Sequence, residues 1–436
     1  MRTNELMLYK HMEEGQILQD MTFLMENYQN DYYNMEDMKG LLYDAVNEIL
    51  EMAVSHGFEG DLWHNYLTYL MASHENAYST SCEIVGPVDG SINQVALHDF
   101  EIFKELFDYD FADLENVMGV DCISMLHDYV GTSGHGSVFN QRIRDRICDL
   151  SKALAETETA VEFKDIMTQF YKEFGVGKLG LHKAFRIAHT EEGALIEPIT
   201  KIAHVHLDDL VGYEIAKKKL IDNTKAFVEG KKANNCLLFG DAGTGKSSSI
   251  KAILNQYYDQ GLRMIEVYKH QFKDLNDVIA QIKNRNYKFI IYMDDLSFEE
   301  FEIEYKYLKA VIEGGLERKP ENILIYATSN RRHLVRERAG DKLEVGADDD
   351  IHSSDTVQEK LSLVYRFGVR IYFGAPDRKE FHTIVKTLAQ RNGITMPEDE
   401  LLLEAGKWEI SHGGLTGRTA QQFIDHLLGK EETQEA

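Results

Sequence analysis

The sequence predicts three regions: an α-helical N-terminal domain over 1–204, an α/β domain with a five-stranded parallel sheet over 205–375, and a small helical domain over 376–436. In most of the first region, to about residue 190, apolar residues recur at a spacing of three and four, which is typical of amphipathic helices. In the second region, short apolar runs alternate with amphipathic segments. This alternation indicates a parallel sheet covered by helices on both faces. In the third region only the helical spacing remains.

The chain has 436 residues, of which 43% are hydrophobic, and its formal net charge is −26. This is enough apolar material for two or three cores. No stretch approaches the roughly 18 consecutive apolar residues that a membrane helix needs, and the N-terminus lacks the apolar core of a signal peptide. The four cysteines lie far apart, without a C-x-x-C pair. We therefore expect a cytoplasmic protein that does not enter a membrane.

The acidic residues are concentrated in the first half of the chain. Residues 1–206 contain 14 Lys and Arg but 35 Asp and Glu, and there is no Lys or Arg between Lys39 and Lys104. A phosphate backbone would be repelled by this region, since nucleic-acid binding normally depends on basic side chains. Nucleic acid is therefore disfavoured as a partner of the N-terminal domain, and we expect this domain to bind a protein.

The predicted elements follow from these patterns in chain order. Two breaks interrupt the N-terminal helices, a turn at 86–90 and a glycine-rich stretch at 131–136. The second break has neither a preceding strand nor a following Lys-Ser, so we interpret it as an interhelical loop rather than a phosphate loop. The acidic, Ser-rich segment 340–356 is predicted to be a solvated loop. The helices are expected within 33–58, 65–78, 94–111, 138–175, 380–393, 398–411 and 419–429, and the strands within 235–240, 263–268, 288–295, 322–330 and 369–373.

A phosphate-binding motif follows the first predicted strand. Residues 240–247 fit the pattern G-x-x-x-x-G-K-[ST] and precede a predicted helix. In such a loop, glycines allow backbone N–H groups to surround phosphates at a helix N-terminus, while the lysine supplies a positive charge and the hydroxyl serves Mg²⁺. The predicted nucleotide-binding residues are Gly240, Asp241, Ala242, Gly243, Thr244, Gly245, Lys246, Ser247 and Ser248.

Carboxylates follow a neighbouring predicted strand, as a phosphate loop requires. Asp294 is the predicted Mg²⁺-side residue, together with Ser247 of the loop. Asp295 is predicted to polarise the attacking water. Because ATPases of this kind often place the longer Glu side chain there, Glu299 stays open as an alternative.

The remaining candidates come later in the chain. Asn330 ends the strand that also carries Thr328 and Ser329, and it is predicted to sense the γ-phosphate or the attacking water. Arg366 precedes the last strand, from which it is expected to reach a phosphate bound by a neighbouring subunit. Arg418 begins a helix of the C-terminal domain and is expected to fold onto the same phosphates.

Together these motifs resemble those of AAA+ ATPases, with Walker A at 240–247, Walker B at 289–295, sensor 1 at Asn330, an arginine-finger candidate at Arg366 and sensor 2 at 417–418. The resemblance covers about 205–430. Within AAA+ proteins, the phrases NNCLLFGDAGTGKSS, DDLSFE and IYATSNRRHL resemble most closely a bacterial family of predicted ATPases known only as a domain of unknown function. The resemblance implies that the helices after Pro376 form the AAA+ lid, and that the adenine pocket includes Leu210, Val211 and Gly212.

The sequence thus predicts an AAA+ ATPase that binds and hydrolyses ATP with Mg²⁺. It is expected to form a homo-oligomer, either a ring or an ATP-induced assembly, and to remodel a protein client bound by the N-terminal domain. Two alternatives stay open. One is a DNA-associated loader, because the Asp-Asp ending of Walker B also resembles helicase loaders. The other is a non-hydrolysing ATP switch that scaffolds partners. The segment 263–278 contains no aromatic-apolar-Gly trio, which weakens a processive unfoldase interpretation.

Overall fold

The computed structural model describes residues 1–87, 89–131, 140–190, 193–200, 202–298, 304–313, 320–330 and 363–434. These residues form two compact units, Met1–His182 and Lys183–Ala436. The predicted loop at 340–356, most of the glycine-rich stretch at 131–136, and Glu299 lie outside the described residues. Within the described residues, no helix combines the length and the apolar character needed to cross a membrane.

The first unit is helical, as the sequence predicts, and local signals set the ends of its helices. Asn34 caps the start of α2 by accepting a hydrogen bond from the Glu36 backbone N–H, and Gly57 ends it in the left-handed region, with φ of 73°. The capping box of Thr159 and Glu162 starts α8. The helices are α1 (Gln16–Asn27), α2 (Met35–His56), α3 (Leu62–Ser73), α4 (Ala77–Val85), α5 (Ile92–Phe107), α6 (Ala112–Met118), α7 (Gln141–Ala155), α8 (Ala160–Phe174) and α9 (Gly177–Leu181).

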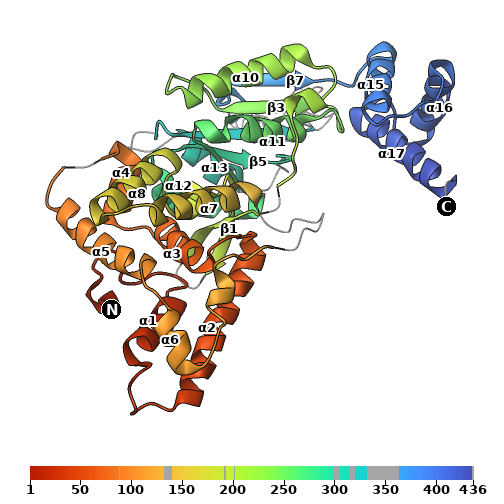
Figure 1. Cartoon of the computed structure of the whole chain (residues 1–436). Coiled ribbons are helices and arrows are strands. Elements are labelled where there is room, and N and C mark those ends of the chain that lie inside the picture. The colour runs from red at the N-terminus through yellow and green to blue at the C-terminus, as the bar shows by residue number, and fades with distance from the viewer. Residues whose placement is uncertain are drawn as a thin grey trace. The chain divides into compact units, whose positions relative to one another are not determined.

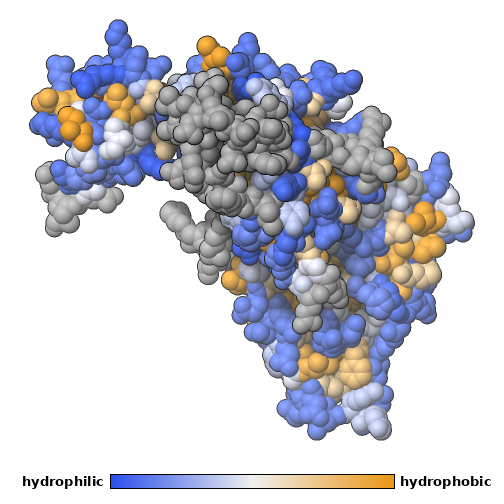
Figure 2. Space-filling view, turned by 180° about the vertical axis from the view of Figure 1, so that it is seen from behind, coloured by the Kyte–Doolittle hydropathy of each residue, from blue (hydrophilic) through white to orange (hydrophobic). Residues whose placement is uncertain are grey.

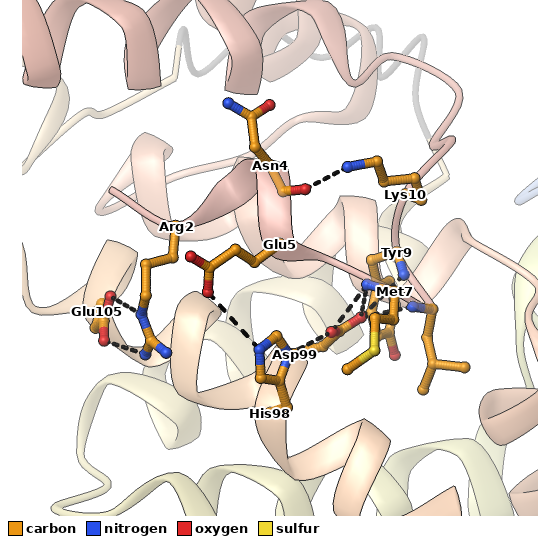
Figure 3. Close-up of polar contacts among 10 residues, drawn as sticks. Arg2, Asn4, Glu5, Met7, Tyr9, Lys10, His98, Asp99 and Glu105 are labelled. Atoms are coloured by element: carbon orange, nitrogen blue, oxygen red, sulfur yellow. Dashed lines mark hydrogen bonds and ion pairs between the residues drawn. The ribbon is translucent and has the colours of Figure 1, made fainter.

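A single buried carboxylate anchors the N-terminal segment of this unit. Asp99 on α5 is fully buried and accepts hydrogen bonds from the backbone N–H groups of Met7, Leu8 and Tyr9, at 2.7–3.2 Å (Figure 3). Because a buried charge is costly unless it is hydrogen-bonded, these three donors are what allow Asp99 to lie in the core. Nearby, the indole of Trp63 is buried and donates to the carbonyl oxygen of Leu106 at 3.1 Å.

The second unit is built on one sheet of seven strands in the order β2-β1-β4-β5-β6-β3-β7 (Figure 1). All five sequence-predicted strands are present, and neighbouring members of this set pair in parallel. Their apolar runs suit this position, because the side chains of a central parallel strand are buried on both faces. The five strands are β3 (Cys236–Gly240), β4 (Leu262–Glu266), β5 (Lys288–Met293), β6 (Ile323–Ser329) and β7 (Val369–Phe373).

The predicted strand number of five is wrong, because the sheet has two more strands. β1 (Ala184–Thr190) pairs in parallel with β4, and β2 (Gly193–Pro198) pairs with β1 as an antiparallel hairpin. Both strands lie in 1–204, the region expected to be all-helical, but they belong to the second unit. In β2, exposed and buried residues alternate. A half-exposed edge strand of six residues lacks the continuous apolar run by which the central strands are identified.

Helices cover the sheet, and on one face α10 (Glu214–Val228) and α11 (Lys246–Tyr257) pack against it. Ile290 and Tyr292 of β5 belong to this core, while Phe289 and Ile291, which are equally buried, point to the opposite face. Within the described residues, the other α-helices of this unit before the C-terminal region are α12 (Leu275–Ile282) and α13 (Glu304–Glu313). β5 is therefore a central strand buried on both faces, which fixes the position of the residues that follow it.

The chain ends in a helical bundle with its own small core, described here as the lid bundle. It consists of α15 (Arg378–Arg391), α16 (Glu398–Ser411) and α17 (Gly417–Gln434), seen together at the C-terminal end of Figure 1. Trp408 of α16 packs against this core, and its indole stacks on the imidazole of His412 with ring centroids 3.7 Å apart. On the face shown in Figure 2, hydrophilic residues predominate among the coloured atoms, and hydrophobic residues form separate small patches.

Candidate functional site

The candidate site lies where three neighbouring strands end. β6 lies between β3 and β5, and the three are parallel, so their carboxyl ends share one edge of the sheet. The phosphate loop follows β3, the aspartates follow β5, and Thr328 is the penultimate residue of β6. This edge is where open α/β sheets bind ligands.

The phosphate loop has the backbone that its glycines permit. Gly240, Gly243 and Gly245 all have positive φ, at 136°, 74° and 91°. At Gly240 a Cβ atom would lie 2.1 Å from the carbonyl oxygen of Phe373 on β7, so any side chain there would collide with backbone. Glycine is thus needed both for the conformation and for the close approach of β3 and β7.

Lys246, the first residue of α11, lies in the interior of the loop. It is 6% exposed, and its ammonium donates hydrogen bonds to the carbonyl oxygens of Asp241, at 2.6 Å, and Gly240, at 3.1 Å. Burial lowers the pKa of Lys246, while the nearby carboxylates, foremost Asp241, oppose this shift. The chain therefore holds a cationic side chain inside a glycine-rich loop at the N-terminus of a helix, which is an arrangement suited to phosphate.

A hydroxyl and a carboxylate meet beside Lys246. The Ser247 hydroxyl donates a hydrogen bond of 2.7 Å to Oδ1 of Asp294, and the Thr328 hydroxyl donates one of 2.5 Å to the same oxygen. Burial would raise the pKa of Asp294, but the hydrogen bonds that it accepts from Thr328 and Ser247 oppose this shift, and its pKa is lowered. Hard oxygen atoms from a serine and an ionised carboxylate are the donors that Mg²⁺ prefers, so Ser247 and Asp294 fit this ion.

Asp295 is held in a defined orientation. It has a φ of 47°, its backbone N–H donates to the Thr328 hydroxyl at 2.9 Å, and its Oδ1 accepts from the side-chain amide of Asn330 at 2.8 Å. The next residue, Leu296, donates its N–H to the Thr328 carbonyl oxygen at 2.7 Å. Left-handed backbone is costly for a non-glycine residue and persists only where its surroundings fix it, often at functional sites.

A cavity of about 700 Å³ brings most of the predicted residues together. It is lined by loop residues from Ala242 to Ser248, by Asp294, Asp295 and Asn330, and by Leu210 and Val211. Leu210 also approaches the loop closely, since a Cβ on Gly245 would lie 2.8 Å from its Cδ2. Gly212 is not among the lining residues, but it has a positive φ of 83° directly after them.

The lid bundle closes one side of this cavity. Arg418 lines it, and its backbone N–H donates to the carbonyl oxygen of Gly243 in the phosphate loop at 3.2 Å. Gln421, three residues later on α17, lines the cavity as well. Arg418 is exposed, whereas Arg366 is half-buried and is not among the residues that line the cavity.

Asp241 connects the phosphate loop to the segment that leads into the lid bundle. Its Oδ2 accepts a hydrogen bond of 2.7 Å from the backbone N–H of Ala375, and its own N–H donates to the Phe373 carbonyl oxygen at 3.0 Å. In addition, the Tyr213 hydroxyl donates to the carbonyl oxygen of Gly374 at 3.0 Å. The chain between β7 and α15 is thus tied to the phosphate loop and to Tyr213, which lines the cavity.

Three residues near the site do not stand out from the sequence. Thr328 is expected there only as a neighbour of Asn330, yet its hydroxyl bonds both aspartates. Its strand lies between the strand that leads into the loop and the strand that leads into the carboxylates, which is a signal for this role. Tyr292 was not considered, although the two-residue period of a strand places it on the same face as Asp294. Gln421 gave no signal beyond its place one turn after Arg418.

A protein-family model matches residues 180–431, and its description is Protein of unknown function (DUF815). The chain belongs to the DUF815 family. The match spans the phosphate loop, both aspartates and nearly all of the C-terminal helical bundle, and it confirms the resemblance to a family known only by a domain of unknown function. No curated protein sequence matches the chain.

Solved structures similar to the DUF815 protein include three variants of RuvB from Thermotoga maritima. Each is 16% identical in sequence and is aligned over 53% of this chain. The TM-scores are 0.38, 0.37 and 0.37, and the alignments cover 67%, 67% and 66% of the RuvB chains.

Proposed function

We propose that this DUF815 protein binds ATP together with Mg²⁺, hydrolyses it, and uses the nucleotide cycle to remodel a protein partner. The observation that carries the proposal is the pairing of Ser247 Oγ with Asp294 Oδ1 at 2.7 Å, beside the phosphate loop. This hydrogen bond joins the first turn of α11, which follows β3, to the residue that follows β5. In the sheet, β5 is separated from β3 by β6. A hydroxyl and a carboxylate so placed are what a phosphate loop uses to hold Mg²⁺ against nucleotide phosphates.

The binding step uses the loop and the lysine. Backbone N–H groups of the loop, at the N-terminus of α11, are expected to receive phosphate oxygens, and the Lys246 ammonium to exchange its bonds with loop carbonyl oxygens for phosphate. Mg²⁺, when bound, would neutralise charge on the phosphates. Leu210 and Val211 are proposed to contact the base from the side of the cavity that they line.

Hydrolysis requires a group that orients water, and we assign this role to Asp295. The Asn330 amide donates to one lone pair of Asp295 Oδ1, and the carboxylate of Asp295 has further lone pairs with which to accept a hydrogen bond from water. Arg418 faces the cavity from the lid bundle and is proposed to stabilise charge on the phosphates. Arg366 is proposed to act on the site of a neighbouring subunit, which makes a homo-oligomer part of the proposal.

The partner is proposed to be a protein bound by the first unit. Supporting this are the excess of acidic over basic residues in 1–206 and the long stretch without Lys or Arg. Both features oppose contact with a phosphate backbone.

The test is the steady-state rate of ATP hydrolysis by the full chain, measured with and without DNA and compared with Lys246→Ala. The proposal predicts a rate that needs Mg²⁺, is lost in Lys246→Ala and does not respond to DNA. Stimulation by DNA would favour the loader instead. Tight ATP binding without turnover would favour the non-hydrolysing switch.

A further inference from the structure

Within the part of the chain that the structure describes, the buried hydroxyl of Tyr292 has no hydrogen-bond partner. Tyr292 lies on β5 and is 2% exposed, and its oxygen belongs to the small set of buried side-chain polar atoms without a partner in the described part of the chain. A buried hydroxyl that makes no hydrogen bond costs free energy, so its retention calls for an explanation. A phenylalanine would fill the same space without this cost.

The position of Tyr292 relates it to the predicted magnesium ligands. It precedes Asp294 by two residues, so both side chains leave the chain on the same face of the sheet. On that face it packs in the core that includes α11, whose second residue is Ser247.

The carboxylate of Asp294 has room for a further donor. The Ser247 and Thr328 hydroxyls both bond its Oδ1, and no hydrogen bond to Oδ2 is recorded within the described residues. Carboxylates that bind metal are themselves held by hydrogen bonds from surrounding groups, which fix their orientation. A phenol fixed on the same strand is such a donor, provided that the carboxylate turns slightly toward it.

We propose that Tyr292 is a positioning residue for Mg²⁺: its O–H donates to the Asp294 carboxylate when Ser247 and Asp294 turn their oxygens toward the ion. The inference rests on the proposed function of the same site. It assigns Tyr292 no contact with nucleotide or water. In this proposal the hydroxyl forms its hydrogen bond only when Mg²⁺ is bound.

The chain provides a matched control in Tyr326, the register partner of Tyr292 on β6. Tyr326 is also fully buried and belongs to the same core. Its hydroxyl, however, is hydrogen-bonded to Asn223 and Thr224 of α10, both at 2.9 Å, and not to the aspartates. The variants Tyr292→Phe and Tyr326→Phe therefore remove the same atom from neighbouring strands, but only one removes it from the candidate metal site.

The experiment measures binding of a fluorescent ATP analogue to the full chain, first with EDTA and then across a Mg²⁺ titration. We expect Tyr292→Phe to leave the affinity for the ATP analogue in EDTA unchanged. The Mg²⁺ concentration that gives half of the Mg²⁺-dependent increase in analogue binding should rise about tenfold or more. We expect Tyr326→Phe to leave both values unchanged. Without ligand, the midpoint temperature of thermal unfolding should fall only in Tyr326→Phe, because of the two hydroxyls only that of Tyr326 has hydrogen-bond partners within the described residues. Added Mg²⁺ and ATP should raise this temperature less in Tyr292→Phe than in the wild type.

Three results would overturn the inference. An unchanged Mg²⁺ midpoint in Tyr292→Phe would remove Tyr292 from metal binding and leave the nucleotide site standing. An equal shift in both variants would make the effect a general response to a lost buried hydroxyl. A wild-type chain that binds no nucleotide, with or without Mg²⁺, would overturn the proposed function together with the inference.

Discussion

The side-chain amide of Asn330 donates a hydrogen bond of 2.8 Å to Oδ1 of Asp295. The two residues follow neighbouring strands, and the Thr328 hydroxyl bonds the Asp295 backbone from the same strand end as Asn330. The carboxylate is therefore oriented by both its backbone and its side chain. This relationship favours Asp295 as the residue that acts on water.

Asp295→Asn should retain ATP binding but slow hydrolysis about a hundredfold or more, because an amide cannot take a proton from water. The measurement is single-turnover hydrolysis, combined with titration of a fluorescent ATP analogue. Glu299→Gln is the comparison variant. If it slows hydrolysis and Asp295→Asn does not, the water-orienting role passes to Glu299.

Lys246→Ala should weaken ATP binding by at least about thirtyfold, equivalent to ~2 kcal/mol, because the phosphates lose the cationic side chain that the loop encloses. Titration with a fluorescent ATP analogue measures this. Lys251→Ala is a suitable control, since it removes a lysine from the same helix that does not line the cavity. Unchanged affinity in Lys246→Ala would remove the loop from the mechanism.

Arg366→Ala should bind ATP normally and hydrolyse it poorly, because this arginine does not line the cavity of its own chain and is proposed to act in a neighbour's. Specific activity of the wild type should rise with protein concentration. Mixing Arg366→Ala with Lys246→Ala gives the sharper measurement, since each variant supplies what the other lacks. A rate independent of concentration, in a chain that stays monomeric with ATP by light scattering, contradicts shared sites.

Asp241→Ala should expose the backbone N–H of Ala375 to solvent, because the carboxylate that accepts its hydrogen bond at 2.7 Å is removed. Hydrogen exchange at Ala375 should then accelerate about tenfold or more, the equivalent of ~1.4 kcal/mol of lost protection. Asp241→Asn keeps an acceptor oxygen and should preserve most of the protection. Equal exchange in the wild type and Asp241→Ala would show that the bond does not hold this segment.

Asp99→Ala should lower the free energy of unfolding of the first unit by about 3 kcal/mol or more, because three backbone N–H groups lose the buried carboxylate that accepts their hydrogen bonds. Denaturant unfolding followed by circular dichroism measures the change. Asp99→Asn keeps the size and one acceptor oxygen, so its loss should be smaller. ATP binding by the second unit should be unaffected in both variants.

Sequence reasoning succeeded where one local pattern determines the structure. Apolar runs of the central strands follow from burial on both faces, and the loop at 240–247 follows from a strand, three glycines and a helix start. It failed at β1, which pairs with β4, a strand more than sixty residues further along the chain, and at β2, which pairs with β1 at the edge of the sheet. A half-exposed edge strand such as β2 carries no continuous apolar run.

The site shows the same division. Lys246, Ser247, Asp294, Asp295 and Asn330 were predicted because each occupies a fixed place relative to a strand end, and the structure places all five around one cavity. The hydrogen bonds of Thr328 to both aspartates depend on β6 lying beside β5 in the sheet. This neighbourhood is a property of the folded sheet and not of any local residue pattern. The unpartnered state of the Tyr292 hydroxyl depends on packing around it, which no residue pattern specifies.

The two tryptophans of the chain are divided between its two units. Trp63 lies in the core of the first, and Trp408 stacks on His412 in the lid bundle of the second. The protein therefore carries one tryptophan in each unit. Trp408→Phe would leave tryptophan emission from the first unit alone, and Trp63→Phe would leave tryptophan emission from the lid bundle alone. Unfolding of each unit, and any response of the lid bundle to nucleotide, can then be followed optically without attached dyes.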